Sequence, residues 1–323
     1  MLHSLVQIPI YSTMIALPFV LSLLAATLVN SQNIVLTNDD GWAVAQIRAQ
    51  FDALTTAGFN VVLSAPAENQ SGTGSSSATP KPLTQPCEFN TCPTGSPATG
   101  SNSSMPRFNY VNSFPVDAVR FGIQTLSPQF FGKSPDFVVS GPNVGNNLGS
   151  GITGSGTVGA ACEAAIEGIP SVAFSGASTS QVSYTTLQSS PNSAATKAAL
   201  LYSQLTVDFV EALIAPSARP ILPSGITVNV NFPSTSLSGC TNIANYEFVF
   251  SRLTSDSSAT DVVTCNNGGH LPTENSVIAK SGSGSKCFVS VTVIDATTKK
   301  DVSATTQAAV LNRLGSFLSC LPN

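Results

Sequence analysis

The chain has 323 residues, of which 42% are hydrophobic, so it can bury a sizeable core in one long domain or two small ones. Only 9% of the residues are charged, against roughly 25% in a typical soluble domain, so Ser, Thr, Asn and Gln must supply much of the polar surface. The net charge of −4 argues against a nucleic-acid polymer or an anionic membrane surface as a partner, since either would call for a basic patch.

The N-terminal segment has the features of a secretory signal peptide. Residues 1–31 contain no Lys, Arg, Asp or Glu, and an apolar run extends from Met14 to Val29. That run is shorter than the ~20 residues of a spanning helix, which argues against the alternative of a membrane anchor. Val29 and Ser31 are small enough for the −3 and −1 positions of a cleavage site. We therefore predict a secreted protein whose mature domain, residues 32–323, has no membrane attachment.

Seven cysteines fit an oxidising compartment, in which disulfides form and persist. Cys87 and Cys92 are close in sequence and could staple one loop. Two more bridges, whose pairing the sequence leaves open, could form among Cys240, Cys265, Cys287 and Cys320. Cys162 is the odd one and is predicted to be a buried free thiol. The sequon Asn102-Ser-Ser104 predicts glycosylation of a polar loop.

Short apolar strands alternate with helical patterns after the leader, which predicts an α/β fold with a parallel sheet and helices on both faces. The strand-like runs are Ile34–Leu36, Val61–Leu63, Phe137–Val139 and Val172–Phe174. Apolar residues recur at helical spacing from Val44 to Leu54, from Val116 to Leu126 after Pro115, and from Ala198 to Leu213.

Two regions depart from this alternation. Residues 72–106 are rich in Ser, Thr, Gly and Pro and are predicted to be a long loop insertion held by Cys87 and Cys92. Between about residues 240 and 295, Phe248–Phe250 and Phe288–Val293 suggest antiparallel hairpins, an extension that would suit a homodimer. A closing helix follows, with an inner face of Val310, Leu311, Leu314, Phe317 and Leu318. One domain with a hairpin extension is the favoured organisation.

The three most polar loops each follow an apolar strand directly. They are residues 38–41 (Asn-Asp-Asp-Gly), 65–72 (Ala-Pro-Ala-Glu-Asn-Gln-Ser-Gly) and 140–149 (Ser-Gly-Pro-Asn-Val-Gly-Asn-Asn-Leu-Gly). In an open α/β sheet, ligands bind outside the carboxyl ends of the strands. We therefore expect the three loops to lie along one rim of the sheet and to carry the chemistry.

The first loop contains adjacent carboxylates, Asp39 and Asp40, which repel each other unless a cation lies against them or one is protonated. The hydroxyl of Ser71 and the amide oxygen of Asn143 could complete an all-oxygen shell, with water at the remaining positions. Such ligands suit Mg²⁺ or Mn²⁺, and also Ca²⁺, rather than zinc. An ordinary turn and helix cap is the alternative for Asn-Asp-Asp-Gly on its own, and the shared rim makes a metal site the better interpretation.

A second candidate site is the segment Gly154–Gly159, which opens a helix of small residues. Backbone amides at a helix start, with two hydroxyls beside them, form an anion site that suits phosphate, and close packing of the helix on the sheet is compatible with this. His270 is the only histidine beyond the predicted leader and lies in an Asn-Asn-Gly-Gly-His segment, a predicted hairpin loop at the surface. A histidine-rich zinc site is therefore excluded, and a Ser-His-Asp triad would depend on this one residue.

Taken together, these loops resemble the survival protein SurE family, which are metal-dependent phosphatases and nucleotidases with a Rossmann-like three-layer core, and specifically a secreted, eukaryotic-type member. The resemblance covers most of the predicted mature chain in order. Its motifs are Leu36–Gly41, Ser64–Pro66 with Asn69–Gly72, Pro135–Asn143, Asn147–Gly149, Ser155–Ala160 and Glu163–Pro170, with weaker matches at Tyr110–Arg120, Val228–Pro233 and Val289–Thr297.

The resemblance implies acid phosphatase or 5'-nucleotidase activity toward small phosphorylated substrates. It implies that the metal ligands are Asp39, Asp40, Ser71 and Asn143, and that the phosphate pocket is lined by Asn147, Ser155, Gly156 and Thr157. The chain departs from the family at Gln70, Ser150–Gly151, Gly154 and Trp42–Ala45, where the family commonly has a basic residue, an acidic pair, a tyrosine and Ala-Pro-Gly respectively. These departures leave the metal set whole and concern substrate preference and rate.

These features predict a phosphoric monoester hydrolase. The ion would polarise a phosphate oxygen and lower the pKa of a bound water that attacks in line. Asp39 or Asp40 would orient or deprotonate that water, and the helix-start amides with Thr157 would stabilise charge on the equatorial oxygens.

Two other functions remain as alternatives. A non-catalytic secreted protein that binds metal and phosphate on the same fold is favoured by the departures at Ser150–Gly151 and Gly154. A dinucleotide-dependent oxidoreductase is suggested by G-x-G-x-x-G at residues 149–154 and again at 154–159. The first copy, however, begins about nine residues past its strand, and no acidic residue follows the next strand, so this alternative is remote.

Overall fold

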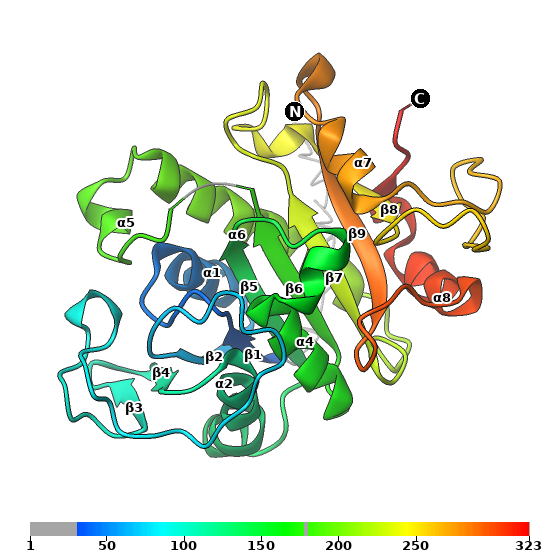
Figure 1. Ribbon diagram of the computed structural model, residues 1–323. Coiled ribbons are helices and arrows are strands. Elements are labelled where there is room, and N and C mark those ends of the chain that lie inside the picture. Colours follow the sequence, from blue (N-terminus) through cyan, green and yellow to red (C-terminus); the bar gives the residue numbers. More distant parts are fainter. Residues whose placement is uncertain (1–30, 178–179, 323) are drawn as a thin grey trace, which may run out of the picture. The chain divides into compact units, whose positions relative to one another are not determined.

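The computed structural model describes residues 31–177 and 180–322, and almost all of the predicted signal peptide lies outside these residues. Its strands are β1 (Asn33–Thr37), β2 (Asn60–Pro66), β3 (Thr99–Asn102), β4 (Met105–Val111), β5 (Phe137–Val144), β6 (Ser171–Gly176), β7 (Ile226–Phe232), β8 (Tyr246–Ser251), β9 (Cys287–Asp295) and β10 (Leu318–Ser319). They form one mixed sheet in the order β10-β8-β9-β7-β6-β5-β1-β2-β4-β3 (Figure 1).

The centre of this sheet is parallel, as the sequence predicts. β1 pairs in parallel with β2 on one side and with β5 on the other, and β6 and β7 continue the parallel run beyond β5. The antiparallel pairs lie toward the edges, between β3 and β4 and between β7 and β9. Because β2, β1 and β5 are parallel neighbours, their carboxyl ends lie at one edge of the sheet, and the three polar loops begin there.

Helices cover both faces of the sheet, which gives the predicted three layers. The helices are α1 (Ala45–Thr56), α2 (Pro115–Phe121), α3 (Ser127–Phe131), α4 (Gly156–Ile166), α5 (Thr186–Ser189), α6 (Ala194–Ile214), α7 (Glu274–Ala279) and α8 (Ala304–Leu314). Ile34 and Leu36 of β1 belong to the core that includes α1, α6 and α8, whereas Val35 between them packs with residues of α2 and α4. No helix in the described part is both long and apolar enough to cross a membrane.

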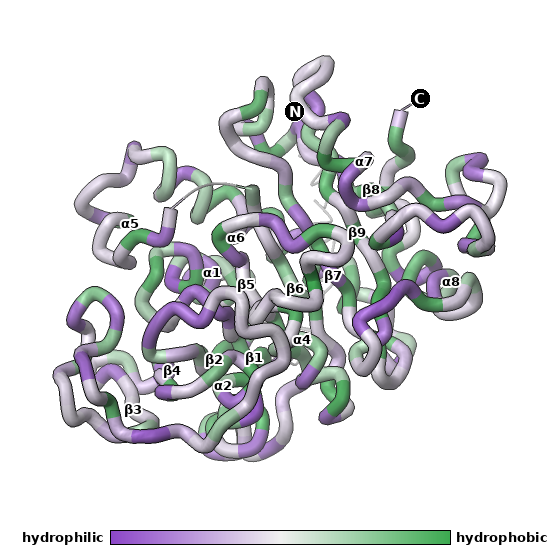
Figure 2. The backbone as a smooth tube through the Cα atoms, in the orientation of Figure 1, coloured by the Kyte–Doolittle hydropathy of each residue, from purple (hydrophilic) through white to green (hydrophobic). Residues whose placement is uncertain are grey.

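Successive side chains of β1 therefore pack into different cores, because side chains point alternately to the two faces of a strand and both faces are buried here. Figure 2 shows hydrophobic residues concentrated along the central strands and hydrophilic residues on many of the connecting loops. The core therefore lies on both sides of the parallel strands and fixes the positions from which the rim loops emerge.

The predicted hairpins between residues 240 and 295 are wrong. β8 and β9 exist, but they pair in parallel, and β9 pairs antiparallel with β7 instead. The reason is the connection of residues 252–286, which carries α7: a connection of that length allows a parallel crossover, whereas an antiparallel hairpin needs only a short turn. His270 lies exposed in this connection and not in a hairpin loop. The homodimer prediction thus loses the hairpin on which it was based.

Three smaller features also differ from, or complete, the sequence-based expectations. β3 and the start of β4 form regular structure inside the segment 72–106 that was expected to be loop. The closing helix α8 ends at Leu314, so Phe317 and Leu318 lie beyond it. The bridges are Cys87–Cys92, Cys240–Cys287 and Cys265–Cys320, and Cys162 is a buried free thiol, as predicted.

Candidate active site

The chain leaves β1 into a tight turn that holds the two predicted carboxylates. The side chain of Asn38 closes this turn, because its Nδ2 donates to the carbonyl of Gly41 (3.0 Å) and its Oδ1 accepts from the Gly41 amide (3.2 Å). Such Asx bonding is what makes Asn favourable at the start of a turn. Asp39 and Asp40 are almost completely buried, with exposed fractions of 2% and 0%.

Asn143 lies beside Asp40, at the end of the neighbouring strand β5. The amide of Val144, the next residue, donates to Asp40 Oδ2 (2.8 Å). A bulge between Ser140 and Asn143 interrupts the pairing of β5 with β6, and bulges of this kind re-aim side chains next to active sites. Asn143 Nδ2 donates to the carbonyl of Gly145 (2.7 Å), while its Oδ1 is buried and has no hydrogen-bond partner.

Ser71 reaches the same rim from the loop after β2. The amide of its neighbour Gln70 donates to the backbone carbonyl of Asp39 (2.7 Å), which fixes this loop against the first. The hydroxyl and amide of Ser71 both donate to Asn69 Oδ1 (2.7 and 2.9 Å), and the side chain itself is exposed. The loops that carry Asn143 and Ser71 are therefore both hydrogen-bonded to the Asp39–Asp40 turn, through the amides of Val144 and Gln70. That these four residues share an ion stays a prediction.

Gln181 is a site residue that the sequence analysis missed. Its Nε2 donates to Asp40 Oδ1, and its Oε1 accepts from Asn69 Nδ2 (2.9 Å), so it bridges the first and second loops. No motif marks this residue. The available signal was topological, since Gln181 follows β6, another parallel strand whose carboxyl end lies at this rim.

The start of α4 faces Asp39, which joins the predicted phosphate segment to the metal segment. The hydroxyl of Thr157 donates to Asp39 Oδ1. A Cβ on Gly156 would lie 2.8 Å from Asp39 Cβ and 2.9 Å from Pro115, so the close approach of helix and turn requires glycine there. Ser155 is the N-cap, and its Oγ accepts from the amide of Val158 (3.1 Å).

Asn147 is held in place by residues of the neighbouring strands. Its side chain donates to Ser175 Oγ (2.8 Å), and its amide donates to Asn231 Oδ1 (2.8 Å). Ser175 is the strand partner of Asn143, so Asn147 also lies at the rim. Two further polar residues, Asn229 and the buried Glu274, hold this segment. Asn229 donates to the Asn147 carbonyl and to Glu274. Glu274 also accepts from the Gly149 amide (2.7 Å).

The electrostatics of this rim fit a divalent cation. Burial raises the pKa of Asp39, against the hydrogen bond from Thr157. Burial, followed by repulsion from Asp39, raises the pKa of Asp40 well above its usual value. A cation beside both carboxylates would offset this cost, and the unpartnered Oδ1 of Asn143 offers a further oxygen ligand. The candidate ligands offer carboxylate, amide and hydroxyl oxygens, which suit Mg²⁺, Mn²⁺ or Ca²⁺ better than zinc.

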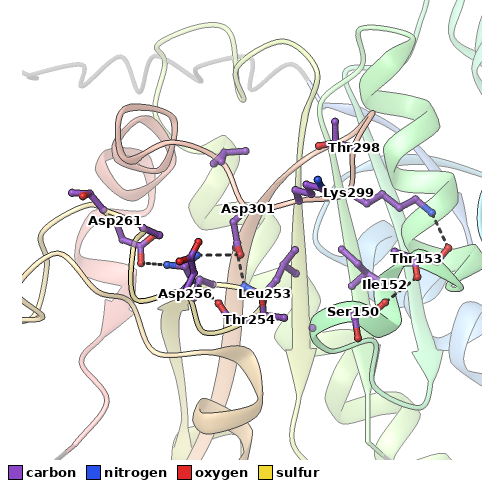
Figure 3. Close-up of a pocket in the computed structure, with 16 residues that line it drawn as sticks. Ser150, Ile152, Thr153, Leu253, Thr254, Asp256, Asp261, Thr298, Lys299 and Asp301 are labelled. Atoms are coloured by element: carbon purple, nitrogen blue, oxygen red, sulfur yellow. Dashed lines mark hydrogen bonds and ion pairs between the residues drawn. The ribbon is translucent and has the colours of Figure 1, made fainter.

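A cavity of about 500 Å³ is lined by residues of three segments, within residues 149–153, 252–261 and 298–302 (Figure 3). Its lining includes Ser150, Thr153 and Lys299, and Lys299 Nζ donates to the Thr153 carbonyl (3.4 Å). The buried guanidinium of Arg252 in this cavity is neutralised by ion pairs with Asp261 (3.0 Å) and Asp301 (3.6 Å). None of the eight predicted site residues lines this cavity, so it is separate from the metal and phosphate groups.

The family model described as "Survival protein SurE" matches residues 34–256. The chain belongs to this family. A protein named "Acid phosphatase" from Yarrowia lipolytica is 33% identical over 308 residues, covering 87% of this chain and 84% of the relative. A "5'-nucleotidase SurE" from Lawsonia intracellularis is 34% identical over 205 residues, covering 64% of this chain and 67% of the relative. The predicted resemblance is confirmed.

A solved SurE protein from Aquifex aeolicus has the same fold as this chain. Its TM-score is 0.57 at 23% sequence identity, with 87% of this chain and 98% of the other covered. The Rossmann-like, mostly parallel sheet is thereby confirmed. The oxidoreductase alternative loses its structural basis, because residues 149–153 form a short 3-10 helix rather than a turn that leads directly from a strand into a helix.

Proposed function

We propose that this chain is a secreted, divalent-metal-dependent phosphomonoesterase of the acid phosphatase and 5'-nucleotidase type. The names of the SurE-family relatives support hydrolysis of small phosphoric monoesters. The observation that carries the proposal is the position of Asp39, whose buried carboxylate adjoins Asp40 on one side and the start of α4 on the other. Asp39 thus belongs to the proposed metal site and also contacts the start of α4, which is proposed to bind phosphate.

In this proposal Asp39, Asp40, Ser71 and Asn143 hold the ion, which can be Mg²⁺, Mn²⁺ or Ca²⁺. When bound, such an ion supplies positive charge that polarises a phosphoryl oxygen and activates water for attack. Val144 and Gln181 fix both oxygens of Asp40, so its carboxylate keeps one orientation through the reaction.

The remaining residues of the rim bind and orient the phosphate group. Asn147, immobilised by Ser175 and Asn231, would contact it from one side, and the first amides of α4 would contact it from the other. Thr157 holds Asp39 in place, and Asp39 or Asp40 accepts the proton of the attacking water. Donors aimed at the equatorial oxygens stabilise charge that develops there.

Secretion is part of the proposal and is supported by the three disulfides, which form and persist in oxidising compartments. Expression of the full sequence in a eukaryotic host should place the protein in the medium, with an N-terminus near residue 32. N-terminal sequencing would test this. Recovery of the uncleaved chain from the membrane fraction would contradict it.

The catalytic proposal is tested by phosphate release from a panel of monoesters and short polyphosphates with Mg²⁺, Mn²⁺, Ca²⁺ or no metal. Release should require the ion and stop in excess chelator. Asp40→Asn should lower turnover by roughly 10²-fold or more, as expected for a positioned catalytic group, whereas Asp208→Asn on α6 should not. Full activity of Asp40→Asn, or in excess chelator, would defeat the proposal. Calorimetric metal binding without any phosphate release would instead identify a non-catalytic binding protein.

A further inference from the structure

The disulfide loop Cys87–Cys92 lies against the turn that carries the metal-binding carboxylates. Glu88, the first residue inside this loop, accepts a hydrogen bond from the amide of Ala43 through its Oε1. Its backbone amide donates to the carbonyl of Ala67 (3.1 Å). One residue therefore holds both the segment after Asp39–Asp40 and the segment that leads to Ser71.

A second contact joins the same two parts of the chain. The indole Nε1 of Trp42 donates to Thr91 Oγ1 (3.0 Å), and Thr91 Oγ1 donates to the carbonyl of Glu88 (2.8 Å). Trp42 is almost fully buried, and the guanidinium of Arg48 donates to its carbonyl (2.7 Å). Residues 41–43 are thus fixed by the disulfide loop on one side and by α1 on the other.

Gly41 shows how closely this loop approaches the turn. Its φ is +118°, a conformation that side chains rarely adopt, and a Cβ there would lie only 2.3 Å from Glu88 Oε2. The Glu88 carboxylate occupies the space beside Gly41, one residue after Asp40. Phe89 and Asn90 within the loop also have positive φ values of 53° and 57°, a conformation that is uncommon for residues such as Phe and better tolerated by Asn. The cross-link between Cys87 and Cys92 opposes relaxation of this loop.

We propose that Glu88 is a positioning residue, held by the Cys87–Cys92 disulfide, that keeps the Asp39–Asp40 turn and the Ser71 loop in register for metal binding. The inference rests on the proposed function for the identity of the ligand, a divalent cation. In this proposal Glu88 is not a ligand of the ion. It acts through Ala43 and Ala67, so its loss weakens the affinity for metal more than the turnover of the metal-loaded enzyme.

The test compares three substitutions of Glu88 in the full-length protein. Glu88→Ala removes the acceptor and Glu88→Asp shortens its reach, whereas Glu88→Gln keeps the length and an acceptor oxygen. The first two should raise the Mn²⁺ concentration for half-maximal phosphate release by about ten-fold, the loss expected when a buried backbone amide is left without its acceptor. Turnover at saturating Mn²⁺ should stay within about two-fold, and Glu88→Gln should resemble the unmodified protein in both. The double variant Cys87→Ser/Cys92→Ser should behave like Glu88→Asp.

A second readout is independent of catalysis. Trp42 is the single tryptophan of the chain, so acrylamide quenching of its fluorescence reports directly on the segment that Glu88 holds. Quenching should increase in Glu88→Asp and in the disulfide variant. It should not change in the control Glu247→Ala, which removes a remote ion pair with Lys286.

The outcomes separate this inference from the proposed function. If no metal supports phosphate release by the unmodified protein, the proposed function fails, and calorimetric Mn²⁺ affinity together with Trp42 quenching still decides the role of Glu88. If Glu88→Ala does not fold, Glu88→Asp and the disulfide variant carry the test. Unchanged Mn²⁺ affinity and unchanged quenching in folded Glu88→Asp would overturn the inference.

Discussion

Thr157 links the candidate metal site to the protein interior through both its side chain and its backbone. The side chain is fully buried and donates to Asp39, while its carbonyl accepts from Ser140 Oγ (2.7 Å) on β5. A buried hydroxyl that donates to a carboxylate contributes more than a neutral hydrogen bond, on the order of 1.5–3 kcal/mol. The position of Asp39 thus depends on a residue of α4.

We predict that Thr157→Val lowers kcat/KM by about 10- to 100-fold, because it replaces this hydroxyl with a methyl group of the same shape. Thr157→Ser keeps the donor and should retain most of the activity. Steady-state kinetics of both variants, with circular dichroism to confirm folding, would check this. Equal activities of the two variants would show that the hydroxyl has no role.

Among single residues, the sequence motifs indicated the candidate ligands. They did not indicate the residues that hold those ligands in position. Adjacent carboxylates at a strand end marked Asp39 and Asp40 as candidate metal ligands, and strand ends placed Ser71 and Asn143 on the same rim. Their roles as ligands stay predictions. Gln181 and Glu88 were not predictable, because each contacts the site from a loop whose path depends on tertiary packing. Their roles appear only when the Cys87–Cys92 loop and the segment after β6 are seen against the three polar loops.

The elements of the parallel centre were predictable for a physical reason. Strands buried on both faces commonly contain continuous apolar runs, and such runs make β1, β2, β5 and β6 stand out in the sequence. β7 is equally buried, but Thr227, Asn229 and Asn231 interrupt its apolar run. β8 and β9 stand out equally, but their direction does not follow from composition. It is set by the long connection between them and by the packing of α7, whose Val277 contacts Val249 of β8 and Phe288 of β9.

α7 also contributes Glu274, whose carboxyl is fully buried beneath the segment of Asn147. Burial raises the pKa of Glu274 to about 8, above its ordinary 4.5. The folded state therefore binds the proton more tightly than the unfolded state. The stability that this proton contributes is fully present below pH 4.5 and is lost as the pH rises through 8.

We predict that Glu274→Gln removes this part of the pH dependence. As the pH rises from 5 to 9, the free energy of unfolding of the variant should increase relative to that of the unmodified protein. The change is on the order of 4 kcal/mol at most, since one pKa unit corresponds to about 1.4 kcal/mol. Urea unfolding of both proteins at pH 5, 7 and 9 measures the difference. The same difference at every pH would contradict the assignment, and Glu247→Gln serves as a partly exposed control.

Across the whole described domain, the disulfides divide into two kinds. Cys87–Cys92 spans 5 residues and lies against the candidate metal site. Cys240–Cys287 and Cys265–Cys320 span 47 and 55 residues and connect segments around β8, β9 and β10, at the opposite end of the sheet from β3 and β4. A cross-link stabilises mainly by restricting the unfolded chain, and more so for longer loops.

Stability and activity should therefore respond to different bridges. Removing Cys265–Cys320 by paired serine substitution should lower the free energy of unfolding by about 4 kcal/mol, against about 2 kcal/mol for Cys87–Cys92, from the loop lengths alone. Metal affinity should respond in the reverse order, because only the short loop touches the Asp39–Asp40 turn. Denaturant unfolding and Mn²⁺ titration of the two double variants measure both quantities. The variant without Cys265–Cys320 could instead be folded at 25 °C and still show the larger loss of Mn²⁺ affinity. Metal affinity would then depend on the far edge of the sheet, and the proposed difference between the two kinds of bridge would be wrong.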